Sequence, residues 1–192
     1  MTTPNPAALE FLLHRRSRPA KTLTTPVPDE TALEPILTAA ARSPDHGKLE
    51  PWRFIVIEKG AMPRLAEQAE EHAKALGLAD ADVAKARNQF DQGHLAVAVV
   101  ACPDETAKIP VIEQTYSAGA VCLALLNAAL AAGWGANWLS GSVSHDPAFC
   151  SAALGLAPHE KIAGFIHIGT ETSAPPDRPR PDLTAKTTWV SS

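Results

Sequence analysis

The stretch "LAVAVVACP" at residues 95–103 is apolar from end to end and has the length of a β-strand. A strand with one face in water alternates apolar and polar residues, so an unbroken apolar run predicts a strand that is covered on both faces. We therefore expect a layered fold, in which helices pack against both sides of a sheet.

Three further stretches predict strands that could join the same sheet. They are "WRFIVIE" (52–58), "GANWLSGSV" (135–143), which runs into a Gly/Ser loop, and "KIAGFIHIGT" (161–170). Apolar residues at helical spacing predict helices between the strands. The expected helices cover about 9–15, 29–43 with Asp29 as N-cap, 61–76, 80–90, 110–134, and a short segment after Ser144 or Asp146. The pattern favours an α/β or α+β layered fold.

The chain length suits a single domain with an appended tail. Its 192 residues exceed the usual domain length of about 150 only slightly. We assign the domain to residues 1–170 and an extended C-terminal arm to 171–192. Four prolines keep the arm from packing as helix or sheet on its own: Pro175, Pro176, Pro179 and Pro181. Such an arm either lies across another subunit or is disordered.

Charge and cysteine content limit the class of protein. The formal net charge is −4, so no general polyanion-binding surface is implied and no nucleic-acid partner is expected. The three cysteines, Cys102, Cys122 and Cys150, are far apart in apolar runs, which indicates free buried thiols in a reducing compartment. The N-terminal apolar residues precede the first basic pair, the reverse of a secretory signal. We expect a cytoplasmic protein.

Residues 116–134, "YSAGAVCLALLNAALAAGW", are long and apolar enough to cross a bilayer. The segment is rich in alanine, contains Ser117 and Asn127, and lacks flanking Lys or Arg to anchor a membrane span. We interpret it as a core helix and expect no membrane association. A helix that is apolar all round needs cover on every side, more than a 192-residue monomer offers, so the segment indicates a dimer core.

The first motif with candidate chemistry is "RRS", formed by Arg15, Arg16 and Ser17 at the end of the first expected helix. Basic residues at this position could simply stabilise the negative end of the helix dipole. Alternatively, two guanidinium groups and a hydroxyl form a phosphate clamp, because arginine matches phosphate oxygens with paired hydrogen bonds.

The second motif is Arg42 with "PDHGK" (44–48). Gly47 allows the backbone to approach a ligand closely, and His46 and Lys48 offer hydrogen-bond donors beside it. The third motif, "NWLSG" (137–141), places side chains at the end of a strand, where sites in α/β proteins often form. A solvated turn and a core tryptophan are the alternatives for the second and third motif.

Two kinds of site are not expected. The histidines at 72, 94, 145, 159 and 167 show no metal-ligand spacing with cysteine or carboxylates, so we expect no metal site. No glycine-rich dinucleotide fingerprint follows a strand, which argues against a Rossmann cofactor site.

The order and spacing of the three motifs resemble the FMN-dependent nitroreductase family along nearly the whole chain, in particular its small NAD(P)H nitroreductases. The most specific stretches are "PDHGKLEPWRFIVIE" (44–58) and "GFIHIGT" (164–170). The resemblance implies an α+β, three-layer fold with a mixed, mostly antiparallel central sheet wrapped by helices. It also implies an intertwined homodimer, with the long helix at its core and two FMN molecules at the subunit interface.

The resemblance also implies which residues bind the cofactor. The residues expected to contact FMN are Arg15, Arg16 and Ser17 at its phosphate or ribityl chain, Arg42 and His46 from the second loop, and Trp138, Leu139 and Ser140 beside the flavin. Arg178 or Arg180 in the arm could add a phosphate contact, but neither is counted among the expected site residues.

The implied reaction is carried by the flavin. NAD(P)H, as co-substrate, would give hydride to FMN and leave, and a small-molecule acceptor such as a nitroaromatic or quinone would then be reduced in a ping-pong cycle. We assign no catalytic residue, because the protein supplies placement and electrostatics while the flavin reacts. The alternatives are another flavin reaction on an unknown metabolite, a flavin-binding or flavin-storage module without turnover, and a structural dimer without cofactor.

Overall fold

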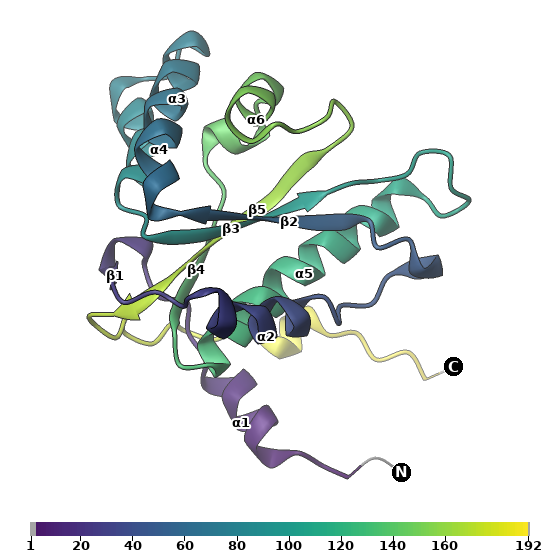
Figure 1. The fold of residues 1–192 in the computed structure, drawn as a ribbon. Helices are drawn as coiled ribbons and strands as arrows, with labels where there is room; N and C mark the ends of the chain where they lie inside the picture. Colours follow the sequence, from purple (N-terminus) through teal and green to yellow (C-terminus); the bar gives the residue numbers. More distant parts are fainter. Residues whose placement is uncertain (1–2, 192) are drawn as a thin grey trace.

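The computed structural model describes residues 3–191 (Figure 1). The helices are α1 (Pro6–His14), α2 (Glu30–Ala40), α3 (Met62–Ala75), α4 (Asp80–Asp91), α5 (Val111–Ala131), α6 (Pro147–Leu154) and α7 (Leu183–Lys186). The strands are β1 (Leu23–Thr24), β2 (Trp52–Glu58), β3 (Leu95–Ala101), β4 (Gly135–Leu139) and β5 (Lys161–Glu171). Every helix and strand expected from the sequence is present, and β1 and α7 are additional.

The long strand β5 organises a five-stranded sheet. It pairs with β3, with β4 and, at its last residues, with β1, while β2 pairs with β3, and all four pairings are antiparallel. Across β5, His167 lies opposite Ala96 of β3 and opposite Asn137 of β4, so β3 and β4 occupy the two edges of β5. Among residues 3–191, β2 has no strand on its outer edge.

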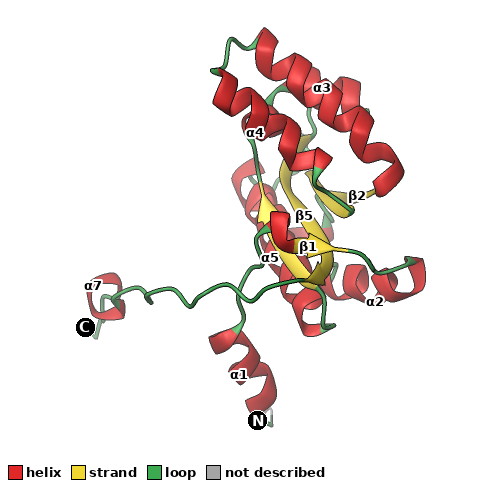
Figure 2. Cartoon of the chain, turned by 90° about the vertical axis from the view of Figure 1, so that its left-hand side faces the viewer, coloured by secondary structure: helices red, strands yellow, loops and turns green. Residues whose placement is uncertain are grey.

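Helices cover both faces of the sheet, which gives three layers (Figures 1 and 2). Alternate residues of β3 enter two separate hydrophobic clusters: Ala96, Ala98 and Val100 pack with α3, α4 and α6, and Leu95, Val97 and Val99 pack with α2 and α5. The unbroken apolar run thus results from burial on both faces, as expected. The predicted fold class, α+β with a mostly antiparallel sheet wrapped by helices, is confirmed.

Helix α2 begins where its capping residue predicts. The Asp29 Oδ1 atom accepts a hydrogen bond from the Ala32 amide at 2.9 Å, which satisfies one of the free N–H groups of the first turn. Leu33, Ile36 and Ala40 lie on its buried face against α5. This packing fixes the loop that follows α2 and contains Arg42.

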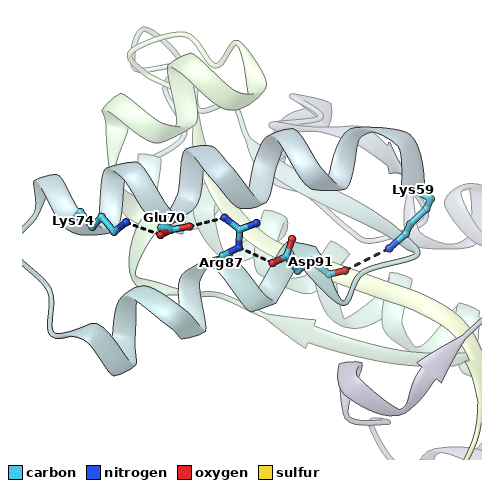
Figure 3. Close-up of polar contacts among 5 residues, drawn as sticks. All are labelled: Lys59, Glu70, Lys74, Arg87 and Asp91. Carbon is cyan, nitrogen blue, oxygen red and sulfur yellow. Dashed lines mark hydrogen bonds and ion pairs between the residues drawn. The ribbon is translucent and has the colours of Figure 1, made fainter.

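The helices α3 and α4 form a hairpin that is held by a chain of ion pairs (Figure 3). Glu70 on α3 pairs with Lys74 on its own helix and with Arg87 on α4, and Arg87 also pairs with Asp91 at 2.7 Å. Lys59 donates to the Asp91 carbonyl at 3.4 Å and so ties the end of α4 to the segment before α3. The side of α4 that carries Arg87 and Asp91 therefore faces α3.

The long helix α5 lies against the sheet and α2. It is the one helix in residues 3–191 that is long and apolar enough to cross a membrane, and a core helix passes the same test. Its buried residues include Val121, Cys122 and Leu125. Tyr116 and Leu123 remain 68% and 46% exposed, so one chain does not cover this helix on all sides.

Candidate functional site

The first motif lies in a cavity of about 470 Å³ between the segment after α1 and the C-terminal arm. Positively charged side chains dominate its walls, and one carboxylate is among them. The charged and hydroxyl-bearing lining residues are Arg15, Arg16, Ser17, Asp177, Arg178 and Arg180. The arm thus returns to the start of the chain and brings two further arginines to the expected phosphate clamp.

Hydrogen bonds order this arginine cavity. The Arg15 Nη2 atom donates to Ser17 Oγ at 3.1 Å, and Arg16 Nη1 donates to Asp177 Oδ1 at 3.0 Å. Arg180 Nη2 lies 3.4 Å from the same Asp177 oxygen. One carboxylate therefore holds two guanidinium groups in place, which leaves a net positive charge for a ligand.

The electrostatics of Arg15 favour an anion in the cavity. Burial lowers the pKa of Arg15, and the neighbouring charges of Arg16, Arg18 and Arg180 lower it further. The Arg15 Nε atom is buried and has no hydrogen-bond partner in the described part of the chain. A phosphate would neutralise the crowded positive charges and would provide strong acceptors for the free donors.

The backbone of the first motif is fixed to the sheet. The Arg18 amide donates to the Ala136 carbonyl at 2.8 Å, and the Arg18 Nε atom donates to Glu171 Oε2 at 2.6 Å. The Asn137 side chain donates to the Arg18 carbonyl at 2.8 Å and also lines the arginine cavity. Arg18 is thus neutralised by Glu171, whereas Arg15 pairs with no carboxylate among residues 3–191.

A second cavity, of about 520 Å³, lies beside the third motif. Residues 139–142 at the end of β4 form one wall, and α4 forms another through Lys85, Asn88 and Gln89. Ala20 lines this cavity and Pro19 lines the arginine cavity. Because neighbouring residues of the same two segments line both, the cavities adjoin along β4, and we call the second one the β4 cavity.

Strand alternation separates Trp138 from the other two expected flavin contacts of the third motif. Leu139 and Ser140 line the β4 cavity, whereas Trp138, the residue before them, points to the other face of the sheet. The indole of Trp138 lies on the backbone of Gly164 in β5. Trp138 remains 38% exposed.

We expect Gly164→Ala to destabilise the protein by about 2 kcal/mol or more. The new Cβ atom would fall on Trp138 Nε1, closer than non-bonded atoms can approach, so the indole would have to move. Urea unfolding and the change in tryptophan emission relative to the wild type measure the two effects. Gly60→Ala, where a Cβ would meet no atom within 4 Å, is the matched control. An unshifted midpoint and spectrum in Gly164→Ala would contradict this packing.

The second motif lies elsewhere in the chain. Arg42 and His46 follow α2, and both side chains are exposed. The His46 Nδ1 atom pairs with Glu113 Oε2 at 2.8 Å. Because Glu113 is in the first turn of α5, the loop with the second motif lies at the start of that helix.

The arginine cluster lies at the other end of α5. Arg15 and Arg16 also line a cavity of about 420 Å³ together with Leu130 and Trp134, which lie at and after the end of α5. At 1.5 Å per residue, the 21 residues of α5 separate its two ends by about 30 Å. A single chain therefore brings the first and third motifs together but not the second.

Several lining residues were not among those expected from the sequence. Asp177 and Gln89 belong to no motif, and Asn137 belongs to the third motif but was not counted as a site residue. Only the Pro/Arg composition of the arm pointed toward Arg178 and Arg180. Among residues 3–191, no three His, Cys, Asp or Glu side chains form a group that could hold a metal ion.

The family model "Nitroreductase family" matches residues 12–170, a range that includes all three motifs. The chain belongs to the nitroreductase family. "Putative NAD(P)H nitroreductase YdjA" of Escherichia coli (strain K12) is 40% identical over 163 residues, which cover 85% of this chain and 87% of that one. A Haemophilus influenzae protein, "Putative NAD(P)H nitroreductase", is 36% identical over 85% of this chain and 88% of its own.

Solved structures share the nitroreductase fold. The nitroreductase-like family protein from Bacillus cereus superposes with a TM-score of 0.78 at 23% identity, and the match covers 100% of both chains. A nitroreductase-type protein from Desulfovibrio desulfuricans, solved in complex with FMN, gives a TM-score of 0.75 at 22% identity over 99% of this chain and 100% of that one. At these identities the likeness establishes the common fold.

Proposed function

We propose that this member of the nitroreductase family is an FMN-dependent oxidoreductase. It takes hydride from NAD(P)H and reduces nitroaromatic or quinone-type acceptors in a ping-pong reaction in the cytoplasm. The observation that carries the proposal is the arginine cavity, which adjoins the β4 cavity. An anion-binding end next to a roomier cavity suits a flavin with a phosphate tail.

The residues of the arginine cavity fit a phosphate group. Arg15 and Arg16 would bind its oxygens, Ser17 would donate from its hydroxyl, and Arg178 and Arg180 would close the cavity from the arm. The buried, unpaired Arg15 Nε atom supports this fit, because an unsatisfied donor of a charged group destabilises a site without a ligand.

The β4 cavity would hold the ring of the cofactor. Leu139 and Ser140 would line it, and the Gly141 amide, which donates to Ser144 Oγ at 2.9 Å, holds the loop in position. When bound, FMN supplies the chemistry of hydride acceptance and donation. The protein's part is to position the ring, to exclude water from one face and to leave access for NAD(P)H and the acceptor.

We propose further that the site is completed by a second copy of the chain. The loop with Arg42 and His46 lies at the start of α5 and Arg15 lies near its other end, and these ends are about 30 Å apart, so all three residues can serve one flavin only if two chains contribute. The exposed large apolar side chains that a partner could cover include Leu9, Leu12, Leu13, Ile112, Tyr116, Leu123, Trp189 and Val190. They lie on α1 and in the arm, which carry the chain to and from the arginine cavity, and on α5, which begins near the second motif.

The double substitution Tyr116→Glu with Leu123→Glu is expected to give a monomer that binds FMN at least about tenfold more weakly. Both side chains are exposed on α5, so the substitutions leave the core of one chain intact. Light scattering after size exclusion and FMN titration measure the two effects. Leu76→Glu, at an exposed leucine after α3, should stay dimeric. A monomer that keeps wild-type FMN affinity would contradict the shared site.

The proposed function is tested by a visible spectrum of the purified protein before and after anaerobic NADPH, with NADH in parallel. Flavin absorbance that bleaches and returns when a nitroaromatic or quinone is added is the expected result. FMN that binds but is reduced by neither nicotinamide would instead indicate a flavin-storage module. A protein that takes up no FMN would refute the proposal.

A further inference from the structure

The side chain of Gln89 lies at the wall of the β4 cavity, on the side of α4 that faces the loop after β4. Arg87 and Asp91 are held toward α3 (Figure 3), and residues two apart on a helix point about 200° apart. Gln89 therefore points away from α3. Its Oε1 atom is 2.5 Å from the position that a Cβ atom on Gly141 would occupy, so the Gln89 amide lies directly against this glycine and would have to move if a larger residue replaced it.

The amide nitrogen of Gln89 has no hydrogen-bond partner in the described part of the chain. This atom, Nε2, is also buried. A buried amide without a partner destabilises the folded state, so such groups normally bind protein, water or a ligand. The other lining residues of the cavity include Asn88 on α4, Gln92 just after it, and Ser140 and Ser142 on the loop, so Gln89 has polar neighbours in this wall.

On the basis of the proposed function, we propose that Gln89 binds the pyrimidine edge of the flavin ring. A primary amide offers one donor and one acceptor side by side. The pyrimidine edge of an isoalloxazine presents the complementary pair, the N3–H donor beside a carbonyl acceptor, whereas its dimethylbenzene edge presents neither. Binding would turn the Gln89 amide, whose Nε2 atom is buried without a partner in residues 3–191, toward the ring.

This assignment fixes the direction in which the cofactor lies. The phosphate binds at the arginine cavity, and the polar edge of the ring is directed toward α4. The ion pairs between Glu70, Arg87 and Asp91 hold α4 in position against α3, so the backbone of Gln89 has a set position relative to the cavity. Flavin analogues changed at N3 should therefore be discriminated by this one residue.

The test measures binding of FMN and of 3-methyl-FMN to the full-length protein by fluorescence titration. The wild-type protein is expected to bind 3-methyl-FMN about tenfold more weakly than FMN, because the methyl group removes the N3–H donor. Gln89→Leu should bind FMN about tenfold more weakly than the wild type and should show equal affinity for the two flavins. Gln89→Glu keeps the acceptor, so it should retain the preference for FMN.

The control is Gln68→Leu on α3, where the amide accepts from Arg64 at 2.8 Å and does not line the β4 cavity. This variant should bind both flavins like the wild type. Wild-type discrimination that persists in Gln89→Leu, or its absence in the wild type, would overturn the role of Gln89 while FMN binding itself supports the proposed function. Failure of the wild type to bind FMN would refute both. Thermal unfolding without FMN checks that Gln89→Leu is folded.

Discussion

Replacing both arginines of the first motif, Arg15→Gln with Arg16→Gln, is expected to weaken FMN binding by at least about a hundredfold. Each substitution removes charge-assisted hydrogen bonds, each worth roughly 1.5–3 kcal/mol. Loss of Arg16 also leaves Asp177 without its 3.0 Å partner, so a carboxylate would then face the phosphate. Titration of the protein with FMN measures the change.

Riboflavin separates a phosphate effect from general damage to the site. It lacks the phosphate, so its affinity should change little in the double variant, and the preference for FMN over riboflavin should disappear. Lys21→Gln, at an exposed lysine in the same segment, is the matched control and should bind both flavins like the wild type. Equal losses for FMN and riboflavin in the double variant would contradict the phosphate assignment.

The elements of the fold could be predicted because local patterns decide them. The apolar run of β3 reflects burial on two faces, and Asp29 caps α2 through its own side chain. The long helix α5 was predicted to be covered on all sides, yet Tyr116 and Leu123 remain exposed in one chain. In the proposed dimer, a second copy of the chain would cover this apolar surface.

The candidate site was predictable only where its residues are close in sequence. Arg15, Arg16 and Ser17 line one cavity, because they are consecutive residues and must lie close together in space. The contact between Arg16 and Asp177 joins residues 161 positions apart, and no sequence period encodes such a contact. Ordinary strand alternation, in contrast, would have separated Trp138 from its neighbours.

Cavity-lining residues on the surface of a helix were the hardest to predict from the sequence. The region 61–90 is polar and rich in alanine, and nothing in it distinguishes Gln89 from other polar residues. Its location depends on the ion pairs that fix the hairpin of α3 and α4 and on the loop after β4, where Gly141 lies against its amide. Both conditions come from tertiary packing.

His167→Leu is expected to reduce the acid sensitivity of the protein between about pH 6.5 and 4. His167 lies in the middle of β5, is 2% exposed, and its Nε2 atom has no hydrogen-bond partner in residues 3–191. Burial lowers its pKa from 6.5 to about 4. The folded protein therefore holds this histidine neutral at pH values where the unfolded chain already binds a proton.

The sign of the effect follows from this difference in proton binding. Above pH 6.5 both states are neutral at His167, and the stability contribution is complete. As the pH falls toward 4, protonation of the unfolded chain lowers the free energy of unfolding, by about 3 kcal/mol in total. Glu160 acts in a lower window, because its hydrogen bond with Arg53 lowers its pKa to about 2 and its contribution is lost as the pH falls from 4.5 toward that value.

Urea unfolding of the wild type and His167→Leu at pH 7.5, 5.5 and 4.5 separates the two groups. The free-energy difference between the proteins should shift in favour of the variant as the pH falls, because leucine has no proton to bind. His159→Leu, at an exposed histidine, should keep the wild-type dependence. A wild type and His167→Leu that lose stability in parallel from pH 7.5 to 4.5 would show that another group controls the acid response. In that case the buried His167, which lies opposite Asn137 of the arginine cavity, would not measurably lower the free energy of unfolding at acidic pH.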